Sequence, residues 1–402
     1  MKAENLGDMK ASSALYYAAF ICFCAAEAIG IDHFAATYSD VQETITILLR
    51  IASLLFLAIK YALQRYSPRS LAILLVATLL AAYCSLRAGR LDLLWTVLFI
   101  GASQGIEVKK LALISLIISI CSVLLTISMW EIGILENIQI VKSGGVIQNS
   151  FGYSHPNQFG KVLMSIVMSL IVLSWGKMHI LRFALIIGIV ASIQFVTGSR
   201  TSAILSVIAL LIGLVAQHSL VNKMRWLTCA LAVSSIGLSF YFMYFYGTQP
   251  WHYFLDELFS NRLYWMHYYI SNYSLSLFGQ GVDGFETLNF STVDSSFLVD
   301  NSFAFILIRY GVIVFVAIVA LLILLVKKGY VYSEPVTLTM LGLSFLVGFS
   351  ESYFFQFDFN YFLIAFGGLL YGSTNVGLFS SDTRQNHGSA HVASLPLSEL
   401  HS

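Results

Sequence analysis

Long apolar runs alternate with short polar stretches along almost the whole chain. A helix needs roughly 20 apolar residues to cross a bilayer core, where it satisfies its own backbone hydrogen bonds. The pattern predicts an all-α, polytopic integral membrane helix bundle with about twelve crossings. The predicted spans are Leu15–Ile31, Ile45–Leu63, Leu71–Leu86, Leu91–Ile106, Leu111–Met129, Phe159–Trp175, Leu181–Val196, Ser202–Ala216, Leu227–Tyr246, Phe303–Val326, Val336–Phe349 and Phe359–Tyr371.

The longest polar interval, Gly247–Ser302, separates the ninth predicted span from the tenth. It contains acids, arginine, histidines and many tyrosines, so we expect an outer loop that forms the lid and wall of a site. We assign residues 1–373 to a single transmembrane domain that includes this loop. Residues 374–402 are rich in Ser, His, Asn and Gly, which is typical of a disordered tail.

Composition excludes a soluble enzyme and a nucleic-acid-binding protein. Hydrophobic residues make up 58% of the 402 residues and charged residues 11%, whereas soluble domains carry about 25% charged residues. The formal net charge of +1 is too small for a nucleic-acid partner. The five cysteines lie in apolar segments, and their odd number and spacing predict neither a disulfide framework nor a metal site.

Basic residues in the short loops predict the orientation, because cytoplasmic loops carry the excess of Lys and Arg. A cytoplasmic N-terminus places nearly every basic loop and the C-terminal tail in the cytoplasm. Arg87, Arg90, Arg200, Arg262 and Arg309 then lie at or near the outer side. Several arginines on one face favour a bound anion, for which guanidinium groups offer paired donors. Each could instead snorkel to lipid headgroups or pair with a nearby acid.

Five motifs follow one another between Gly145 and Ile323. They are FGYSHPNQFG (151–160), TGSRTSAIL (197–205), NRLYW (261–265), LFGQGVDGF (277–285) and DNSFAFILIRYG (300–311). Their order, with a long outer loop before the last motif, resembles the bacterial O-antigen ligase and polymerase superfamily. The resemblance is greatest to the Wzy-like polymerases of O-antigen, capsular and exopolysaccharide repeat units.

The resemblance implies a GT-C-like glycosyltransferase in the cytoplasmic membrane of a bacterium, with its active site on the outer face. The implied reaction moves a growing glycan from an undecaprenyl-pyrophosphate carrier onto the next lipid-linked repeat unit, without a metal or other cofactor. A flippase and a chain-length regulator are the protein partners of such a polymerase. Arg200 matches the arginine after a Thr-Gly-Ser turn and Arg262 the arginine of the outer loop. Both would bind pyrophosphate or sugar.

Two other activities stay open. Ligases of this superfamily transfer glycan to another acceptor and commonly show a His-Asn pair, where this chain has Asp300 and Asn301. The departure disfavours a ligase. A flippase or other transporter would need polar residues along a membrane path, whereas those of this chain gather in outer loops, and no internal repeat supports a transporter.

Transfer to a sugar hydroxyl needs a stabilised pyrophosphate leaving group, an activated hydroxyl and the alignment of both. Arginine can stabilise the leaving group. The base could be Asp300, His155, Asp283 or Glu351, all predicted on the outer side. We expect Asp300, because its place at the junction of loop and helix would fix its position.

The remaining candidate substrate ligands are His155, Asn157, Asn301, Arg87, Arg90, Asp283 and Arg309. Several candidates also have a purely structural interpretation. Asp300 and Asn301 could cap the helix that follows them, and Asn157 could cap the helix after Pro156. The aromatic residues between Tyr264 and Tyr273 could lie at the membrane interface instead of stacking on sugar.

Overall fold

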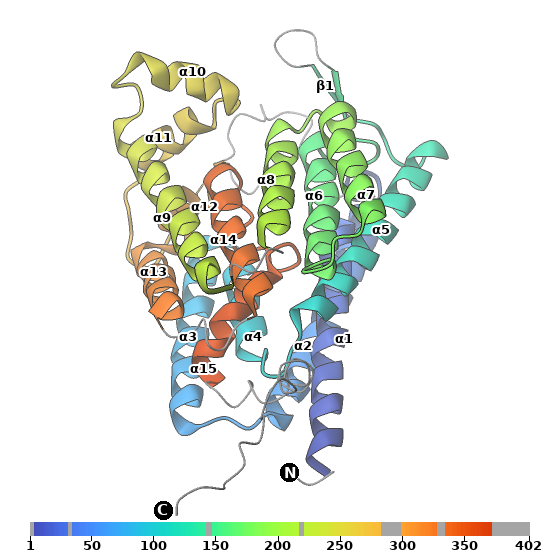
Figure 1. Cartoon of the computed structure of the whole chain (residues 1–402), viewed down its shortest axis with the longest axis vertical. Helices are drawn as coiled ribbons and strands as arrows, with labels where there is room; N and C mark the ends of the chain where they lie inside the picture. The colour runs from blue at the N-terminus through green and yellow to red at the C-terminus, as the bar shows by residue number, and fades with distance from the viewer. Residues whose placement is uncertain are drawn as a thin grey trace, which may run out of the picture.

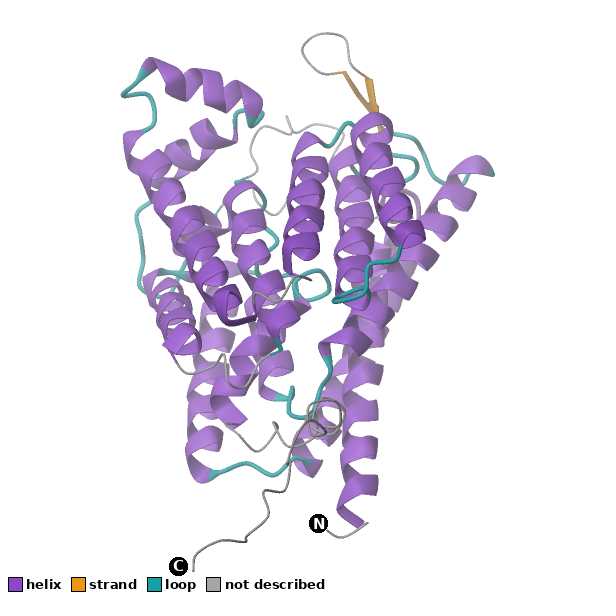
Figure 2. Cartoon of the chain, viewed as in Figure 1, coloured by secondary structure: helices purple, strands orange, loops and turns teal. Residues whose placement is uncertain are grey.

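The computed structural model describes residues 4–30, 34–141, 147–216, 221–282, 299–327 and 334–371. Asp283 and the C-terminal tail from residue 374 lie outside these residues. Within them the fold is helical apart from one short β-hairpin (Figure 2).

Five helices form the N-terminal part of the chain: α1 (Glu4–Gly30), α2 (Phe34–Leu63), α3 (Pro68–Ala88), α4 (Asp92–Gly101) and α5 (Val108–Glu131). Helix α1 packs against both α2 and α5 (Figure 1). The sequence explains the bounds of α3. Ser67 accepts a hydrogen bond from the backbone of Ser70, Pro68 occupies the first turn, and Gly89 ends the helix at a φ of 69°.

The middle of the chain is built around α6 (Pro156–Leu173), which is buried along most of its length. Strands β1 (Gln139–Val141) and β2 (Ile147–Asn149) form an antiparallel hairpin before it. Helix α7 (Ile180–Ser192), the π-helical turn η1 (Ile193–Thr197), α8 (Arg200–Ala216) and α9 (Val221–Phe245) follow. Helices α5, α7 and α8 all pack against α6, which makes it a central element (Figure 1).

The C-terminal part begins with two short helices, α10 (Pro250–Leu258) and α11 (Arg262–Asn272), which lie at the end of α9 at the top left of Figure 1. Then come α12 (Ser302–Phe305), the π-helical turn η3 (Ile306–Tyr310), α13 (Val312–Lys327), α14 (Pro335–Ser350), the 3₁₀ helix η5 (Tyr361–Phe366) and α15 (Gly367–Tyr371). Helix α14 is buried and packs against α9. We call residues 351–360, between α14 and η5, the 351–360 segment.

Seven of the described helices are long and apolar enough to cross a membrane: α1, α2, α3, α5, α6, α7 with η1, and α9. The chain is therefore a multi-pass, all-α membrane protein. The count of twelve crossings stays a prediction, because the other apolar helices are shorter. The fourth predicted span, Leu91–Ile106, contains only the 10-residue α4. At about 1.5 Å per residue, that helix covers roughly half of a bilayer core.

The tenth predicted span, Phe303–Val326, is not one helix. Helix α12 continues directly into η3, and Gly311 separates both from α13. The φ of 91° at Gly311 does not occur inside a helix. Gly279 packs against this break: a Cβ built on Gly279 would lie 1.8 Å from the Arg309 carbonyl oxygen. Because neither glycine has a side chain at this contact, residues 277–282 pack directly on the backbone at the break. The apolar pattern of residues 303–326 does not predict this contact.

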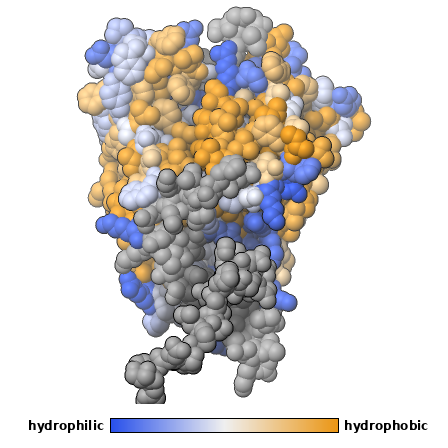
Figure 3. All heavy atoms as spheres, viewed as in Figure 1, coloured by the Kyte–Doolittle hydropathy of each residue, from blue (hydrophilic) through white to orange (hydrophobic). Residues whose placement is uncertain are grey.

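Large apolar side chains cover much of the outside of the molecule (Figure 3). Helix α3 exposes Leu75, Val76 and Leu79, and α7 exposes Leu181. Hydrocarbon accepts such a surface, whereas water does not. The interior is rich in aromatic rings, and the stacked pair of Phe99 and Phe357, with centroids 4.7 Å apart, joins α4 to the 351–360 segment.

Candidate functional site

Arg262 stands at the first position of α11 and is 8% exposed. The turn that places it there depends on two neighbours. Asn261 adopts the left-handed conformation with a φ of 64°, which asparagine tolerates better than most residues. Asp256 then accepts hydrogen bonds from the backbone N–H groups of Leu263 (2.8 Å) and Tyr264 (3.1 Å). These bonds fix the first turn of α11 and aim Arg262 into the protein.

Four groups surround the guanidinium of Arg262. Its Nε lies 3.1 Å from Oδ2 of Asp300, and its Nη1 lies 2.7 Å from Oε1 of Glu351. Nη1 also donates to the Thr201 hydroxyl at 3.2 Å and to the Ser350 carbonyl oxygen. We call Arg262, Asp300, Glu351 and Thr201 the Arg262 cluster. It joins the first turn of α8, the start of α11, the approach to α12 and the end of α14.

The two carboxylates of the cluster differ in exposure. The side chain of Glu351 is 3% exposed and that of Asp300 is 27% exposed. Burial raises the pKa of Glu351 to about 7, although Arg262 acts in the opposite direction. Burial also raises the pKa of Asp300, and Arg262 again opposes the shift. Asp300 is therefore the carboxylate that a substrate can reach, while Glu351 holds Arg262 from inside.

Asn301 is fully buried and serves as the N-cap of α12. Its side-chain oxygen accepts hydrogen bonds from the backbone of Phe303 (3.0 Å) and Ala304 (2.8 Å). Its Nδ2 donates to the Ser239 hydroxyl and to the Phe349 carbonyl oxygen, both at 2.8 Å. Both amide protons and the amide oxygen are thus engaged within the protein, and the role that these bonds show for Asn301 is the cap of α12. Binding of a sugar hydroxyl by Asn301 stays a prediction.

Arg200 begins α8 and its side chain is exposed. The next residue, Thr201, contacts Arg262, so Arg200 lies at the edge of the Arg262 cluster. Among the described residues no hydrogen bond or ion pair to the Arg200 guanidinium is found. The turn before it packs tightly on α6, where a Cβ on Gly160 would lie 2.7 Å from Cβ of Ser199. Motifs 151–160 and 197–205 are therefore in direct contact.

His155, and not Asn157, caps α6. Nδ1 of His155 accepts a hydrogen bond of 3.0 Å from the backbone N–H of Asn157. The expectation that Asn157 could be the cap is wrong. The helix begins at Pro156, so Asn157 lies inside its first turn. Both side chains are half-buried. They stay candidate ligands that lie on the same helix end as Gly160.

Arg87, Arg90 and Arg309 form a second group. Arg90 pairs with Asp92 at 3.0 Å, and Arg309 is fully buried and donates to the Ala88 carbonyl oxygen at 2.9 Å. Both guanidiniums lie over the ring of Phe305, at 5.7 and 5.6 Å from its centroid. Arg87 is exposed. Within the described residues, no hydrogen bond or ion pair links this group to the Arg262 cluster.

The sequence reading did not consider Lys161. This lysine lies inside the predicted span Phe159–Trp175 and is 6% exposed. Its Nζ donates to Oε1 of Gln356, lies 3.6 Å from Oδ2 of Asp358, and stands 4.7 Å from the ring centroid of Tyr353. A single ionisable residue in an apolar span is the signal that could have indicated it.

The Arg262 cluster has the parts that proton abstraction beside an anion needs. Asp300 is a partly exposed carboxylate held by a fixed cation, and Arg200 is an exposed arginine one residue before Thr201 of the cluster. Among the residues that the structure describes, no three His, Cys, Asp or Glu side chains gather as metal ligands would. Comparisons of the chain with protein-family models, with curated proteins and with solved structures gave no match.

Proposed function

We propose that the chain is a membrane-embedded polysaccharide polymerase. It transfers a growing glycan from a lipid pyrophosphate carrier onto the next lipid-linked repeat unit at the outer face of a bacterial cytoplasmic membrane. The observation behind this proposal is the pairing of Asp300 with Arg262 at 3.1 Å while Asp300 keeps a 27% exposed side chain. An exposed arginine, Arg200, stands one residue from Thr201, which bonds the same guanidinium.

Each side chain has a separate part in the proposed reaction. Asp300 accepts the proton of the acceptor sugar hydroxyl, whose oxygen forms a bond to the anomeric carbon of the donor glycan. The bond from that carbon to the pyrophosphate oxygen breaks, and the pyrophosphate leaves with the electron pair. Arg200 neutralises the developing negative charge. Arg262 is a positioning residue, because its Nε pairs with Asp300 while its Nη1 is bonded to Glu351, Thr201 and Ser350.

The position of the site in an apolar helix bundle supports a substrate that is delivered by the membrane over a soluble substrate. The site residues come from the ends of α8, α11 and α14, which belong to an apolar bundle. A lipid pyrophosphate reaches such a site by diffusion in the bilayer, and its anion matches an exposed guanidinium. The pyrophosphate is also a good leaving group, so no general acid is required.

The test is glycan size in a strain that lacks this gene, complemented with wild type, Arg200→Ala or Asp300→Asn. Membrane levels are compared with those of Arg69→Ala, an exposed arginine at the start of α3. We expect single repeat units from the two site variants and long chains from Arg69→Ala. Arg200 is exposed, so its substitution should change stability by less than about 0.5 kcal/mol.

Three other outcomes would change the assignment. Long polymer that accumulates on its lipid carrier in the deletion strain would replace polymerase by ligase. Lipid-linked repeat units that accumulate on the cytoplasmic side would replace it by flippase. Long chains from both site variants would be compatible with polymerase activity, but would show that Arg200 and Asp300 are not part of the active site.

A further inference from the structure

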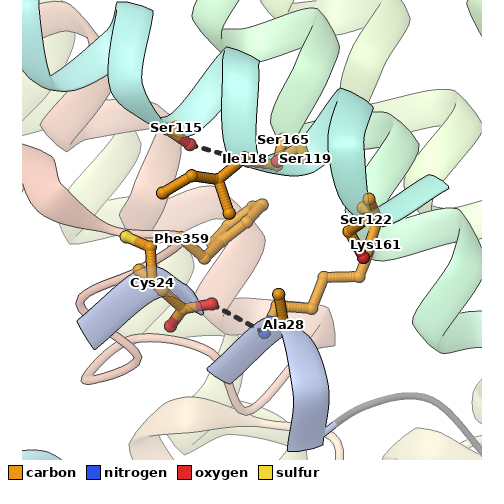
Figure 4. A pocket seen from close by; sticks show the side chains of 11 residues that line it. Cys24, Ala28, Ser115, Ile118, Ser119, Ser122, Lys161, Ser165 and Phe359 are labelled. Carbon is orange, nitrogen blue, oxygen red and sulfur yellow. Dashed lines mark hydrogen bonds and ion pairs between the residues drawn. The ribbon is translucent and has the colours of Figure 1, made fainter. Parts of the chain in front are cut away.

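A cavity of about 40 Å³ lies between α1, α5, α6 and the 351–360 segment (Figure 4). Helix α5 contributes Ser115, Ser119 and Ser122, which share one face because they are four and three residues apart. Helix α6 contributes Lys161 and Ser165, and the segment contributes Asp358. A cavity with this many polar groups inside apolar helices is costly unless something polar occupies it.

The ion pair in the cavity is loose. Nζ of Lys161 lies 3.6 Å from Oδ2 of Asp358, whereas a close charge-assisted pair measures about 2.7–2.9 Å. Nζ of Lys161 also donates to Gln356, so of its three N–H donors one is left beside the loose pair, and Asp358 keeps acceptor sites. Lys161 supplies a donor and Asp358 an acceptor, and the serine hydroxyls supply both.

The charges select the class of ligand. A bare cation would meet Lys161, and a phosphate or carboxylate would meet Asp358, so each would face a like charge at close range. A neutral hydroxyl compound meets no like charge, because each hydroxyl can accept from Lys161 and donate to Asp358. The volume suits this class, since a water-sized group needs roughly 10–15 Å³. About three or four water-sized groups fit.

Entry to the cavity is from the side of the bundle. Ser115 is buried, whereas Ser119 and Ser122, closer to the C-terminal end of α5, are partly exposed. Ala28, near the end of α1, is also partly exposed and lines the cavity. A headgroup carried by a lipid can therefore approach between α1 and α5 without leaving the membrane.

We propose that this cavity is a subsite for the hydroxyl groups of a neutral sugar carried on a lipid. The inference rests on the proposed function, because it takes a lipid-linked sugar as the substrate. It adds a place and a chemical class for one sugar of that substrate. The subsite shares the 351–360 segment with the Arg262 cluster, since Glu351 begins the segment and Asp358 lies near its end.

The test measures protection of an introduced cysteine. The full chain is purified into lipid nanodiscs after alanine replaces its own cysteines, Cys22, Cys24, Cys84, Cys121 and Cys229. Ser119→Cys then places a thiol in the cavity, and Ser128→Cys on the exposed face of α5 is the matched control. The rate of labelling by a small thiosulfonate reagent is measured with three amphiphiles of equal chain length: octyl glucoside, octyl phosphate and octyltrimethylammonium.

We expect octyl glucoside to slow labelling at Ser119→Cys and not at Ser128→Cys. The rate should halve when half of the cavities are occupied. Octyl phosphate and octyltrimethylammonium should leave both rates unchanged. Adding Asp358→Asn should weaken the protection, because it removes the anionic acceptor while the Ser119→Cys thiol still reacts.

Protection by octyl phosphate but not by octyl glucoside would overturn the inference and make the cavity an anion site. Equal rates with all three amphiphiles would reduce it to a water-filled cavity. Undiminished protection in Asp358→Asn would also contradict it. The labelling does not depend on glycan transfer, so loss of the polymerase assignment and loss of the sugar subsite are separate results.

Discussion

Arg262→Met tests whether the Arg262 cluster is a buried ion pair or a surface one. The change removes the cation and leaves Glu351, 3% exposed, without its partner. Above the pKa of Glu351, where its carboxylate is charged, removing its partner costs about 3–5 kcal/mol, because the remaining group must either stay charged without solvent or take up a proton. Asp300, 27% exposed, regains water, so we expect a loss of stability near 3 kcal/mol, at the lower end of that range.

The matched control is Lys110→Met. Lys110 pairs with Glu107 at 2.7 Å, the same distance as Arg262 to Glu351, but it stands at the start of α5 and its side chain is 55% exposed. Exposed pairs contribute about 0–1 kcal/mol, so this variant should lose little stability. Unfolding by SDS in mixed micelles, followed by far-ultraviolet circular dichroism, gives both values.

A second variant separates lost charge pairing from lost packing. Arg262→Met combined with Glu351→Met removes the stranded carboxylate as well, so the double variant should be more stable than Arg262→Met alone. The reasoning is refuted if Arg262→Met loses no more stability than Lys110→Met. It is also refuted if adding Glu351→Met to Arg262→Met lowers stability further.

Three further predictions concern pH, the α12 cap and the break at Gly311. Between its ordinary pKa of 4.5 and the folded pKa of about 7, Glu351 binds more protons in the folded than in the unfolded protein. Stability should therefore fall as pH rises through this window, by on the order of 1–3 kcal/mol, and Glu351→Gln should flatten the profile in SDS unfolding. Asn301→Ala should lower thermal stability by about 2 kcal/mol, whereas Asn301→Asp keeps the capping oxygen and should lose less; equal losses would contradict the cap. Gly279→Ala should destabilise by at least about 2 kcal/mol, because its Cβ would meet backbone at a φ of 80°. Gly188→Ala, with nothing within 4 Å, should be neutral or stabilising by up to about 1 kcal/mol in the same melt.

The long apolar runs were sufficient to predict the main helices, since hydrophobicity and length are read directly from the chain. They did not predict where a run breaks. The tenth run contains a glycine at position 311 whose conformation is imposed by Gly279 packing on it from another segment. The fourth run contains only the short α4, which ends at Gly101, where the carbonyl oxygen accepts from the hydroxyl of Tyr66 on another segment. Both departures come from tertiary contacts.

The candidate site was predictable to a smaller extent. Arg262 and Asp300 were selected from motifs, and the structure brings them together at 3.1 Å. Glu351 was one of four alternatives for the base, and nothing in the sequence pairs it with an arginine 89 residues earlier. The capping roles of His155 and Asn301 depend on which residue begins the helix, and sequence patterns give such boundaries poorly. Lys161 belongs to none of the motif positions, and its only signal in the sequence is a charge inside an apolar run.

The 351–360 segment is held by two buried cations that were synthesised long before it. Lys161 and its partner Gln356 are 195 residues apart, and Arg262 and Glu351 are 89 residues apart. While the chain is being inserted, α6 and the start of α11 must therefore enter their places before the acceptors and acids that satisfy them exist. Until the residues after α14 are made, Lys161 lacks both Gln356 and Asp358, and Arg262 has Asp300 as an acidic partner but lacks the buried Glu351. The order of synthesis thus makes the C-terminal helices a late assembly step, and a chain that stops before Glu351 presents an uncompensated Lys161 to the machinery that removes misassembled membrane proteins.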